Sequence, residues 1–427
     1  MSTTRFFVPF LLLSLGGCFV FNDVEQPGEQ EPPTLTKTVP DRPPADTSSP
    51  DDDVKAYFAG YDVEMIQRGD RWREVGLNLD GVNTQAPDYV RPCEPYVNGA
   101  NPATDGEGGL DNQYGRGVSP YLAVPLPTAI CEMTGSHYHG IGTYVAGLEN
   151  WNGTPNDAQV TVWITPAVGA VPTPDGVEPD PERISWGGER GFDIQVDGEP
   201  ALPPCYDGND YFYLNTDDTV MLPPVGDEPR RPRVYDANAY VADNVVVARI
   251  PASHPMVLMS LYRSLPARLT DGYIVAKLSD DHERIEEAVL AGRFLAEAIL
   301  DVTGEIGVCD TSLVQAFRGT LLGAADLMSD PSRDFQGETC DAISVGIPFK
   351  AVRANVASVH GPAWTPDDHC ELVEEWTANG EGVRRIFGCL SSASKYSFFD
   401  QWDPEKNPGL MDHCQNGTLI PEPPAAN

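Results

Sequence analysis

The fold is decided by the stretch Ala158-Gln159-Val160-Thr161-Val162-Trp163-Ile164. Its apolar residues alternate with Gln and Thr, which predicts a half-buried β-strand because successive side chains of a strand point to opposite faces. Short runs of similar composition recur from Ala56 to Ser279, separated by Gly, Pro, Asn and Asp. The clearest are Trp72–Leu79, Gly140–Leu148, Asp210–Leu214, Asn244–Ile250, Pro255–Leu261 and Tyr273–Leu278. Short strands joined by long polar loops predict a mainly β fold, β-sandwich or jelly-roll-like.

Two helices are expected after these strands. Asp280 and Glu283 have the spacing of a capping box. Apolar residues follow at helical spacing, namely Ile285, Ala288, Val289, Gly292, Leu295, Ala296 and Ile299. A second helix is predicted over Leu313–Met328, and Ala342–Val352 returns to the alternation of a strand. We therefore expect one β body over residues 56–357 with a two-helix excursion near residues 282–328; the alternative is a distinct helical domain from Asp281 onward.

The N-terminus has the pattern of an export signal. Arg5 precedes the apolar run Phe6–Leu15, which is about half the ~20 residues that a membrane-spanning helix needs. The next residues, Leu15-Gly16-Gly17-Cys18, resemble the lipobox of bacterial lipoproteins. This resemblance implies that residues 1–17 are a lipoprotein signal peptide and that Cys18 is acylated. An ordinary secretory signal and a spanning helix are the alternatives, but an ordinary signal needs no cysteine here.

The same resemblance bears on localisation. Phe19 stands where an Asp favours retention at the inner membrane in lipoprotein families, which implies a lipid-anchored protein of the outer membrane. Whether its body faces the periplasm or the surface stays open. Residues 18–55 are predicted to be a disordered tether rich in Pro and acids, because they have almost no large apolar residue after Phe21. The alternative is that this segment docks on the body as a strand.

Charge limits the partners. The chain has 64 acidic and 28 basic residues and a formal net charge of −36. Such a charge repels phosphate backbones, which excludes nucleic acid as a partner. Calcium, cationic partners and plain solubility remain compatible, and the lipid anchor makes the membrane the expected partner.

Cysteine usage agrees with export. Besides Cys18 the chain has eight cysteines, an even number that predicts disulfides in an exported protein, with free buried thiols as the alternative. They are Cys93, Cys131, Cys205, Cys309, Cys340, Cys370, Cys389 and Cys414. Their pairing is open among on the order of a hundred connectivities, and proximity suggests Cys309–Cys340 and Cys93 with Cys131 or Cys205. At least one of the last three must reach back into the body. Residues 358–427 are expected to be an irregular, disulfide-rich tail with a short helix near Glu371–Ala378.

Three loops collect acids, amides and glycines: Asp80–Asn83, Asp105–Asn112 and Asn150–Asp157. Such loops offer carboxylate, amide and backbone oxygens, the hard ligands that calcium takes in numbers of roughly six to eight. The candidate calcium ligands are Asp80, Asp105, Asp111, Asn112 and Asp157. No stretch matches an EF-hand loop, and the alternative is that these residues only form turns.

The same loops carry a second resemblance. Leu77–Thr84, Asp105–Asn112, Asn152–Val160 and Cys340–Ser344 are similar to segments of uncharacterised myxobacterial-type lipoproteins. The likeness spans most of the mature chain. It implies that the body is one recurring unit, and that family has no assigned activity to carry over.

The sequence has few other motifs that indicate catalysis or ligand binding. His137-Tyr138-His139 places two imidazoles on one side of a strand, but no HExxH or CxxC accompanies it, so a surface pair is expected rather than a zinc site. Gly-x-Ser-x-Gly, Walker and dinucleotide motifs are absent from the sequence. An aromatic group suggests either a carbohydrate site or a core strand; it comprises Tyr206, Tyr211, Phe212 and Tyr213 beside Asp207, Asp210, Asp217 and Asp218.

These patterns favour a lipid-anchored cell-envelope protein that binds or presents a ligand and is not an enzyme. Its partner would be a glycan or another envelope protein, and calcium is the candidate cofactor. The alternative is a glycan-active enzyme or a lectin on the same β-sandwich.

Overall fold

The computed structural model is mainly β, as the sequence predicts. All structural statements below concern the residues that it describes. These are residues 39–67, 69–96, 104–122, 140–187, 193–226, 230–250, 256–259, 264–267, 269–300, 311–364, 409, 411–414 and 419.

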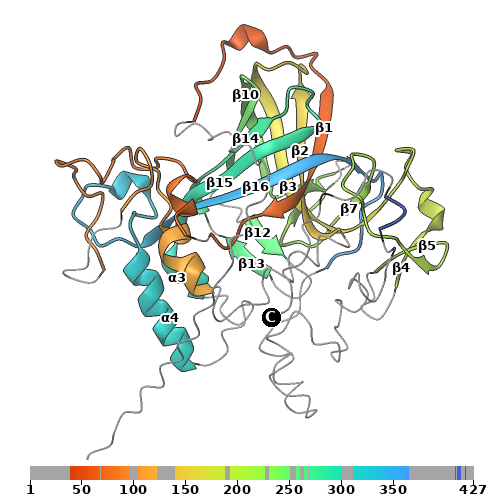
Figure 1. The fold of residues 1–427 in the computed structure, drawn as a ribbon. Helices are drawn as coiled ribbons and strands as arrows, with labels where there is room; N and C mark the ends of the chain where they lie inside the picture. Colours follow the sequence, from red (N-terminus) through yellow and green to blue (C-terminus); the bar gives the residue numbers. More distant parts are fainter. Residues whose placement is uncertain are drawn as a thin grey trace, which may run out of the picture. The chain divides into compact units, whose positions relative to one another are not determined.

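Eight antiparallel strands form a sheet that closes on itself (Figure 1). Around the sheet they are β1 (Val54–Val63), β2 (Ile141–Trp151), β3 (Asp157–Val171), β10 (Val234–Ala242), β11 (Val245–Ile250), β14 (Leu269–Leu278), β15 (Arg284–Leu295) and β16 (Ala342–Val356). Closure comes from β1, in which Tyr57 lies opposite Gly147 of β2 and Ala354 of β16. The sheet is therefore barrel-like, and the expected sandwich or jelly roll is not confirmed.

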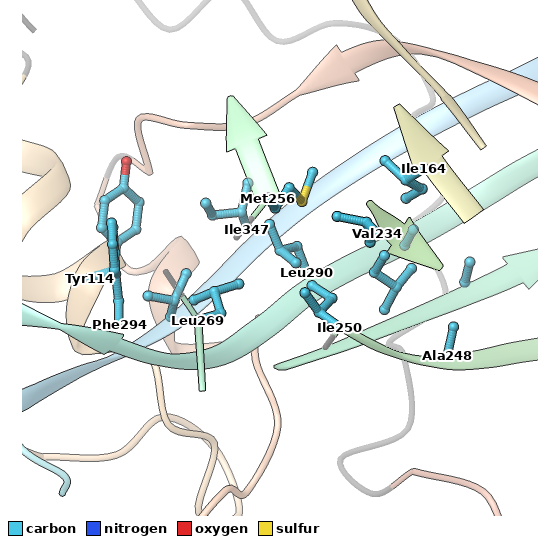
Figure 2. Close-up of a cluster of buried hydrophobic side chains, with 14 of the residues drawn as sticks. Tyr114, Ile164, Val234, Ala248, Ile250, Met256, Leu269, Leu290, Phe294 and Ile347 are labelled. Atoms are coloured by element: carbon cyan, nitrogen blue, oxygen red, sulfur yellow. The ribbon is translucent and has the colours of Figure 1, made fainter. Parts of the chain in front are cut away.

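Apolar side chains fill the inside of the closed sheet (Figure 2). Ile164, Val234, Ile250, Leu290 and Ile347 come from five different strands and belong to this one cluster. An eight-stranded closure leaves an interior just wide enough for side chains. An apolar cavity of about 30 Å³ remains among them, far below the ~300 Å³ of small ligand pockets. Among the described residues this interior is therefore a packed core.

Parts of the sheet are also covered on the outside. β7 (Tyr211–Leu214) pairs with the ends of β3 and β16, and the buried ring of Tyr206 packs in the same cluster. On another side, Val75 and Leu77 pack against Val289 of β15. The strand predicted from residues 158–164 is confirmed. Gln159 is exposed, as the alternation predicts, but Thr161 is buried, so the strand has a solvent-facing side only at its start.

The first expected helix is a strand over most of its length. β15 pairs with β14 on one side and with β16 on the other, and only α3 (Ala296–Leu300) is helical. Because β15 is buried on both faces, its apolar residues need not alternate, and their spacing also fits a helix. The expected capping box is the β14–β15 turn, where Asp281 accepts the N–H of Glu283. The second helix is confirmed as α4 (Thr311–Ala324).

The other predicted strands have mixed outcomes. Gly140–Leu148, Asp210–Leu214, Asn244–Ile250, Pro255–Leu261, Tyr273–Leu278 and Ala342–Val352 all overlap observed strands. Trp72–Leu79 is wrong, since it overlaps the end of η2 (Arg71–Arg73) and continues as an extended loop with one bridge, Leu77↔Asp111. The remaining elements are η1 (Ala45–Thr47), the π-helix η3 (Tyr114–Val118), α1 (Ser119–Leu122), η4 (Pro181–Arg183), β4 (Ile184–Gly187), β5 (Asp193–Val196), β6 (Glu199–Pro200), β8 (Met221–Leu222), β9 (Arg231–Pro232), β12 (Met256–Met259), β13 (Ser264–Ala267) and η5 (Pro331–Arg333).

Residues 39–53, here called the strap, lie on the closed sheet. Arg42 donates hydrogen bonds of 2.6 Å to the carbonyl oxygens of Ala158 and Asn238. Its guanidinium also lies 4.6 Å from the centre of the Tyr240 ring. The strap leads directly into β1 at Val54. The predicted tether is therefore wrong over residues 39–55, and its earlier part lies outside the described residues.

Among the described residues, two disulfides join distant segments: Cys93–Cys340 and Cys205–Cys414. The suggested pairs Cys309–Cys340 and Cys93 with Cys131 or Cys205 are therefore wrong. The expectation that one of the last three cysteines reaches back into the body is confirmed by Cys414. The predictions for Cys18, Cys131, Cys309, Cys370, Cys389, His137–His139 and Glu371–Ala378 lie outside the described residues.

In the described part of the chain, no helix has both the length and the apolar character needed to cross a membrane.

Candidate functional site

Three of the five candidate calcium ligands line one pocket. Asp80, Asp105 and Asp111 surround a cavity of about 60 Å³ together with Asp326, which no sequence motif indicates. These four aspartates define what is called the acid pocket below. They come from three separate parts of the chain, so the fold brings them together.

Close backbone contact places the first of these loops on the sheet. Gly76 lies against Gly346 of β16, and a Cβ added to Gly346 would lie 2.8 Å from the Cα of Gly76. Gly76 also has a φ of +135°, a conformation that other residues rarely adopt. The loop then continues to Leu77, whose carbonyl oxygen accepts the N–H of Asp111 at 2.9 Å. The loops carrying Asp80 and Asp111 are thereby fixed side by side.

A buried arginine holds two of the pocket loops. Arg293 of β15 is 1% exposed and pairs with Asp334 at 2.7 Å. It also donates hydrogen bonds of 2.9 Å to the carbonyl oxygens of Leu79 and Met328. These two residues stand close in the chain to one pocket aspartate each. The Cys93–Cys340 disulfide lines the same pocket and joins its wall to the start of β16.

The pocket carboxylates also organise the loop backbone. One oxygen of each of three aspartates accepts a backbone N–H: Val82 donates to Asp80 at 2.8 Å, Thr84 to Asp105 at 2.7 Å and Leu79 to Asp111 at 2.6 Å. Among the described residues, the second oxygen of Asp111 has no hydrogen-bond partner, although this residue is only 2% exposed. That oxygen is available to a ligand in the pocket.

The acid pocket disfavours full ionisation. Burial is the largest cause that raises the pKa of each of the four aspartates. Repulsion from Asp80, Asp326 and Asp105 raises the pKa of Asp111 further, well above its usual value. Burial, opposed by hydrogen bonds from Ser344, brings the pKa of Asp326 to about 7. At neutral pH the pocket therefore retains protons or favours a bound cation.

Two arginines also stand in the wall of the acid pocket. They are Arg91 and Arg116. Arg116 lies 5.5 Å from the centre of the Trp72 ring and contacts the side-chain oxygen of Gln113 at 3.4 Å. Four aspartates against two arginines leave an excess of negative charge when all are ionised.

The carboxylates do not form a closed coordination shell. Among the described residues, the only group of three His, Cys, Asp or Glu side chains whose ligand atoms all lie within 4.8 Å of one another is Cys205, His413 and Cys414. The four aspartates of the acid pocket do not meet this criterion. A cation in the acid pocket would need water as additional ligands, which calcium accepts.

Asn112 lies behind the pocket and is committed to the fold. Its side-chain nitrogen donates to the side-chain oxygen of Gln67 at 2.8 Å. Its side-chain oxygen accepts the N–H groups of Gly115 and Gly346, each at 3.0 Å. At 2% exposed, Asn112 positions the pocket loop against β16 and has no free oxygen for a metal.

Asp157 lies outside the acid pocket, at the start of β3. It accepts the N–H of Asn152 at 2.8 Å and that of Gln159 at 3.1 Å. It also accepts the hydroxyl of Ser48 in the strap. Its carboxylate therefore shapes a turn and holds the strap on the sheet.

The aromatic group at residues 206–213 is a core strand, which is one of the two readings that the sequence left open. Tyr206, Phe212 and Tyr213 are each 1% exposed. The hydroxyls of Tyr206 and Thr143 form a hydrogen bond of 2.8 Å in the interior. These rings offer no surface on which a sugar could stack.

Asp326 had no local sequence signal. It follows the end of α4, within the range predicted as the second helix, and is remote in sequence from the other three pocket aspartates. The pairing of Leu327 with Ala342 and two hydrogen bonds from Ser344, both on β16, bring it to the pocket.

Comparisons with known proteins add no assignment to this geometry. No family model, no curated protein and no solved structure matches the chain.

Proposed function

We propose that the chain is a lipid-anchored cell-envelope protein, a binding or presentation module whose acid pocket takes up a small cation, with calcium preferred. The observation that carries the cation proposal is the convergence of Asp80, Asp105, Asp111 and Asp326 on one small cavity. Hard carboxylate oxygens suit calcium, and a bound cation would relieve the repulsion among them.

The proposed location in the cell envelope is supported by two independent features. The quartet ending at Cys18 resembles a lipobox, and acyl chains on that cysteine would anchor the chain to the outer membrane. The Cys93–Cys340 and Cys205–Cys414 disulfides suit an oxidising compartment outside the cytoplasm. The excess of acids over bases argues against nucleic acid as a partner.

The size of the acid pocket favours a cation over a glycan. Its volume of about 60 Å³ compares with roughly 10–15 Å³ for one water in the same measure. Pockets for organic ligands start near ~300 Å³. A partly hydrated ion fits, whereas a sugar ring does not. This observation weakens the alternative of a glycan-active enzyme at this site.

Terbium luminescence provides a direct test, because Tb³⁺ replaces Ca²⁺ at oxygen sites and is excited by nearby aromatic rings. Tyr89 lines the acid pocket and would sensitise the ion. We expect the full-length chain to give terbium luminescence that calcium displaces. Asp111→Asn, which keeps the side-chain shape and removes the charge, should weaken terbium binding about tenfold or more.

The matched control is Asp51→Asn, which makes the same charge change at an exposed aspartate of the strap. It should leave terbium binding unchanged. The proposal fails if calcium displaces no terbium signal, or if Asp111→Asn binds terbium as well as Asp51→Asn does.

A further inference from the structure

Cys205, His413 and Cys414 form a second cluster of metal-ligating side chains. Their ligand atoms all lie within 4.8 Å of one another. The Nε2 atom of His413 is 3.4 Å from the Sγ atom of Cys414. Cys205 and Cys414 are both buried, at 4% and 8% exposed.

The two sulfurs of this cluster are joined in a disulfide. Sulfur in a disulfide is a poor metal ligand, because the thiolate is the form that binds metals. Two thiolates and one imidazole are, by contrast, a ligand set that zinc uses, with water in the fourth position. Whether Cys205 and Cys414 form a disulfide or two thiols thus decides whether this cluster can bind a metal.

We propose that the Cys205–Cys414 disulfide covers a site for a thiophilic divalent cation such as Zn²⁺, which becomes available when the bond is reduced. A dithiol reductant supplies two electrons and two protons, so that it becomes a disulfide and the protein gains two thiols. Each thiol then loses its proton to solvent as the metal binds. This site is separate from the acid pocket and does not depend on the proposed function.

One hydrogen bond besides the disulfide joins the two segments that carry the ligands, and two more fix the cysteines locally. The Nε2 atom of His413 lies 2.8 Å from the carbonyl oxygen of Pro203, two residues before Cys205. The N–H of Cys205 donates to the carboxylate of Asp210 at 3.0 Å. The N–H of Cys414 donates to the carbonyl oxygen of Met411 at 2.9 Å. None of these bonds involves sulfur, so all three can persist after reduction; when the metal binds, the imidazole would exchange Pro203 for the metal and the two N–H bonds would remain.

The other disulfide provides an internal comparison. Cys93 and Cys340 are also buried and bonded to each other. Within the described residues, no histidine or carboxylate completes a three-ligand cluster with them. Reduction of this bond should therefore create two thiols without a third protein ligand.

Cobalt(II) is the probe for the test, because its thiolate complexes absorb light by charge transfer from sulfur to metal. The full-length chain is reduced with a phosphine, which leaves no competing thiol, and titrated with cobalt. We expect a charge-transfer band that zinc abolishes and that the oxidised chain lacks. His413→Ala retains both cysteines and should weaken cobalt binding at least tenfold.

Two paired variants separate this site from the remaining cysteines. Cys205→Ser with Cys414→Ser should remove the band, and Cys93→Ser with Cys340→Ser should retain it, with circular dichroism showing that each variant is folded. The proposal is overturned if the reduced wild-type chain gives no band, if the band survives the first pair of substitutions, or if His413→Ala binds cobalt like the wild type.

Discussion

Asp326 binds Ser344 through both oxygens of its carboxyl group. Its Oδ1 atom accepts the backbone N–H of Ser344 at 2.8 Å, and its Oδ2 atom accepts the hydroxyl of the same residue at 2.6 Å. The hydroxyl of Ser344 in turn accepts the N–H of Gln113 at 2.8 Å. Ser344 belongs to β16, so the acid pocket is bonded directly to the closed sheet. The protonation of the pocket must therefore affect the stability of the fold.

Stability without added cation should fall as pH rises through the range set by Asp326. Its pKa is raised from 3.8 to about 7 in the folded chain. Between these values the folded chain binds more protons than the unfolded chain, so the contribution is complete below about 4 and is lost by about 7. Melting temperatures measured in EDTA should therefore decrease over this range.

Asp326→Asn isolates this contribution. The amide oxygen can still accept the N–H of Ser344, but it carries no charge at any pH. At pH 8 the variant should melt above the wild type, with a gain of a few kcal/mol at most, since one pKa unit corresponds to ~1.4 kcal/mol. At pH 5 this advantage should shrink. Parallel curves for the two proteins from pH 5 to pH 8 would show that Asp326 does not titrate as described.

Arg293 should be the most sensitive single position for the pocket loops. Arg293→Met leaves the carboxylate of Asp334 buried without its partner, and breaking a buried ion pair costs ~3–5 kcal/mol. The exposed pair Arg183–Asp197 is the control, and Arg183→Met should leave the melting temperature unchanged. Combining Arg293→Met with Asp334→Leu should recover part of the loss. Equal melting of the two arginine variants would contradict the role of Arg293.

The strap should be released by loss of Arg42. Arg42→Ala removes hydrogen bonds to the carbonyl oxygens of Ala158 and Asn238 and the contact with the Tyr240 ring. Limited proteolysis should then cut within residues 39–53 faster than in the wild type. Arg249→Ala is the control, because Arg249 lies over the Tyr273 ring in the same manner but outside the strap. Equal cleavage rates in the two variants would show that Arg42 does not hold the strap.

The proposed lipid anchor should depend on Cys18 alone. In cells fed a labelled fatty acid, we expect the wild-type chain to carry label and to sediment with membranes. Cys18→Ala should carry no label, because its side chain offers no thiol for acylation. A wild-type chain that is exported and unlabelled would contradict the lipobox interpretation.

Much of the sheet could be predicted because its strands have local signals. Branched residues in β3, β11 and β14 indicate strands wherever they lie in the fold. β15 could not be recognised, because Val75 and Leu77 cover its outer face and remove the alternation that marks a half-buried strand. The composition of the strap predicts disorder because it has almost no large apolar residue, whereas polar contacts such as those of Arg42 hold it on the sheet.

The acid pocket and the disulfides were predictable only in part, because only some of their residues have a local sequence signal. Asp80, Asp105 and Asp111 stand in loops whose composition suggests oxygen ligands. Asp326 and the partner of each cysteine depend on contacts between remote segments, such as Cys93 with Cys340, and nothing in the local sequence encodes them.

The most direct test of the account is the melting temperature of the oxidised, full-length chain at pH 7.5 in calcium and in EDTA. A ligand at 100 times its dissociation constant adds ~2.7 kcal/mol to the free energy of unfolding, which corresponds to a rise of several degrees. We predict this rise for the wild type and for Asp51→Asn, and its loss in Asp111→Asn. Identical melting of the wild type in calcium and in EDTA would contradict a cation site in the acid pocket.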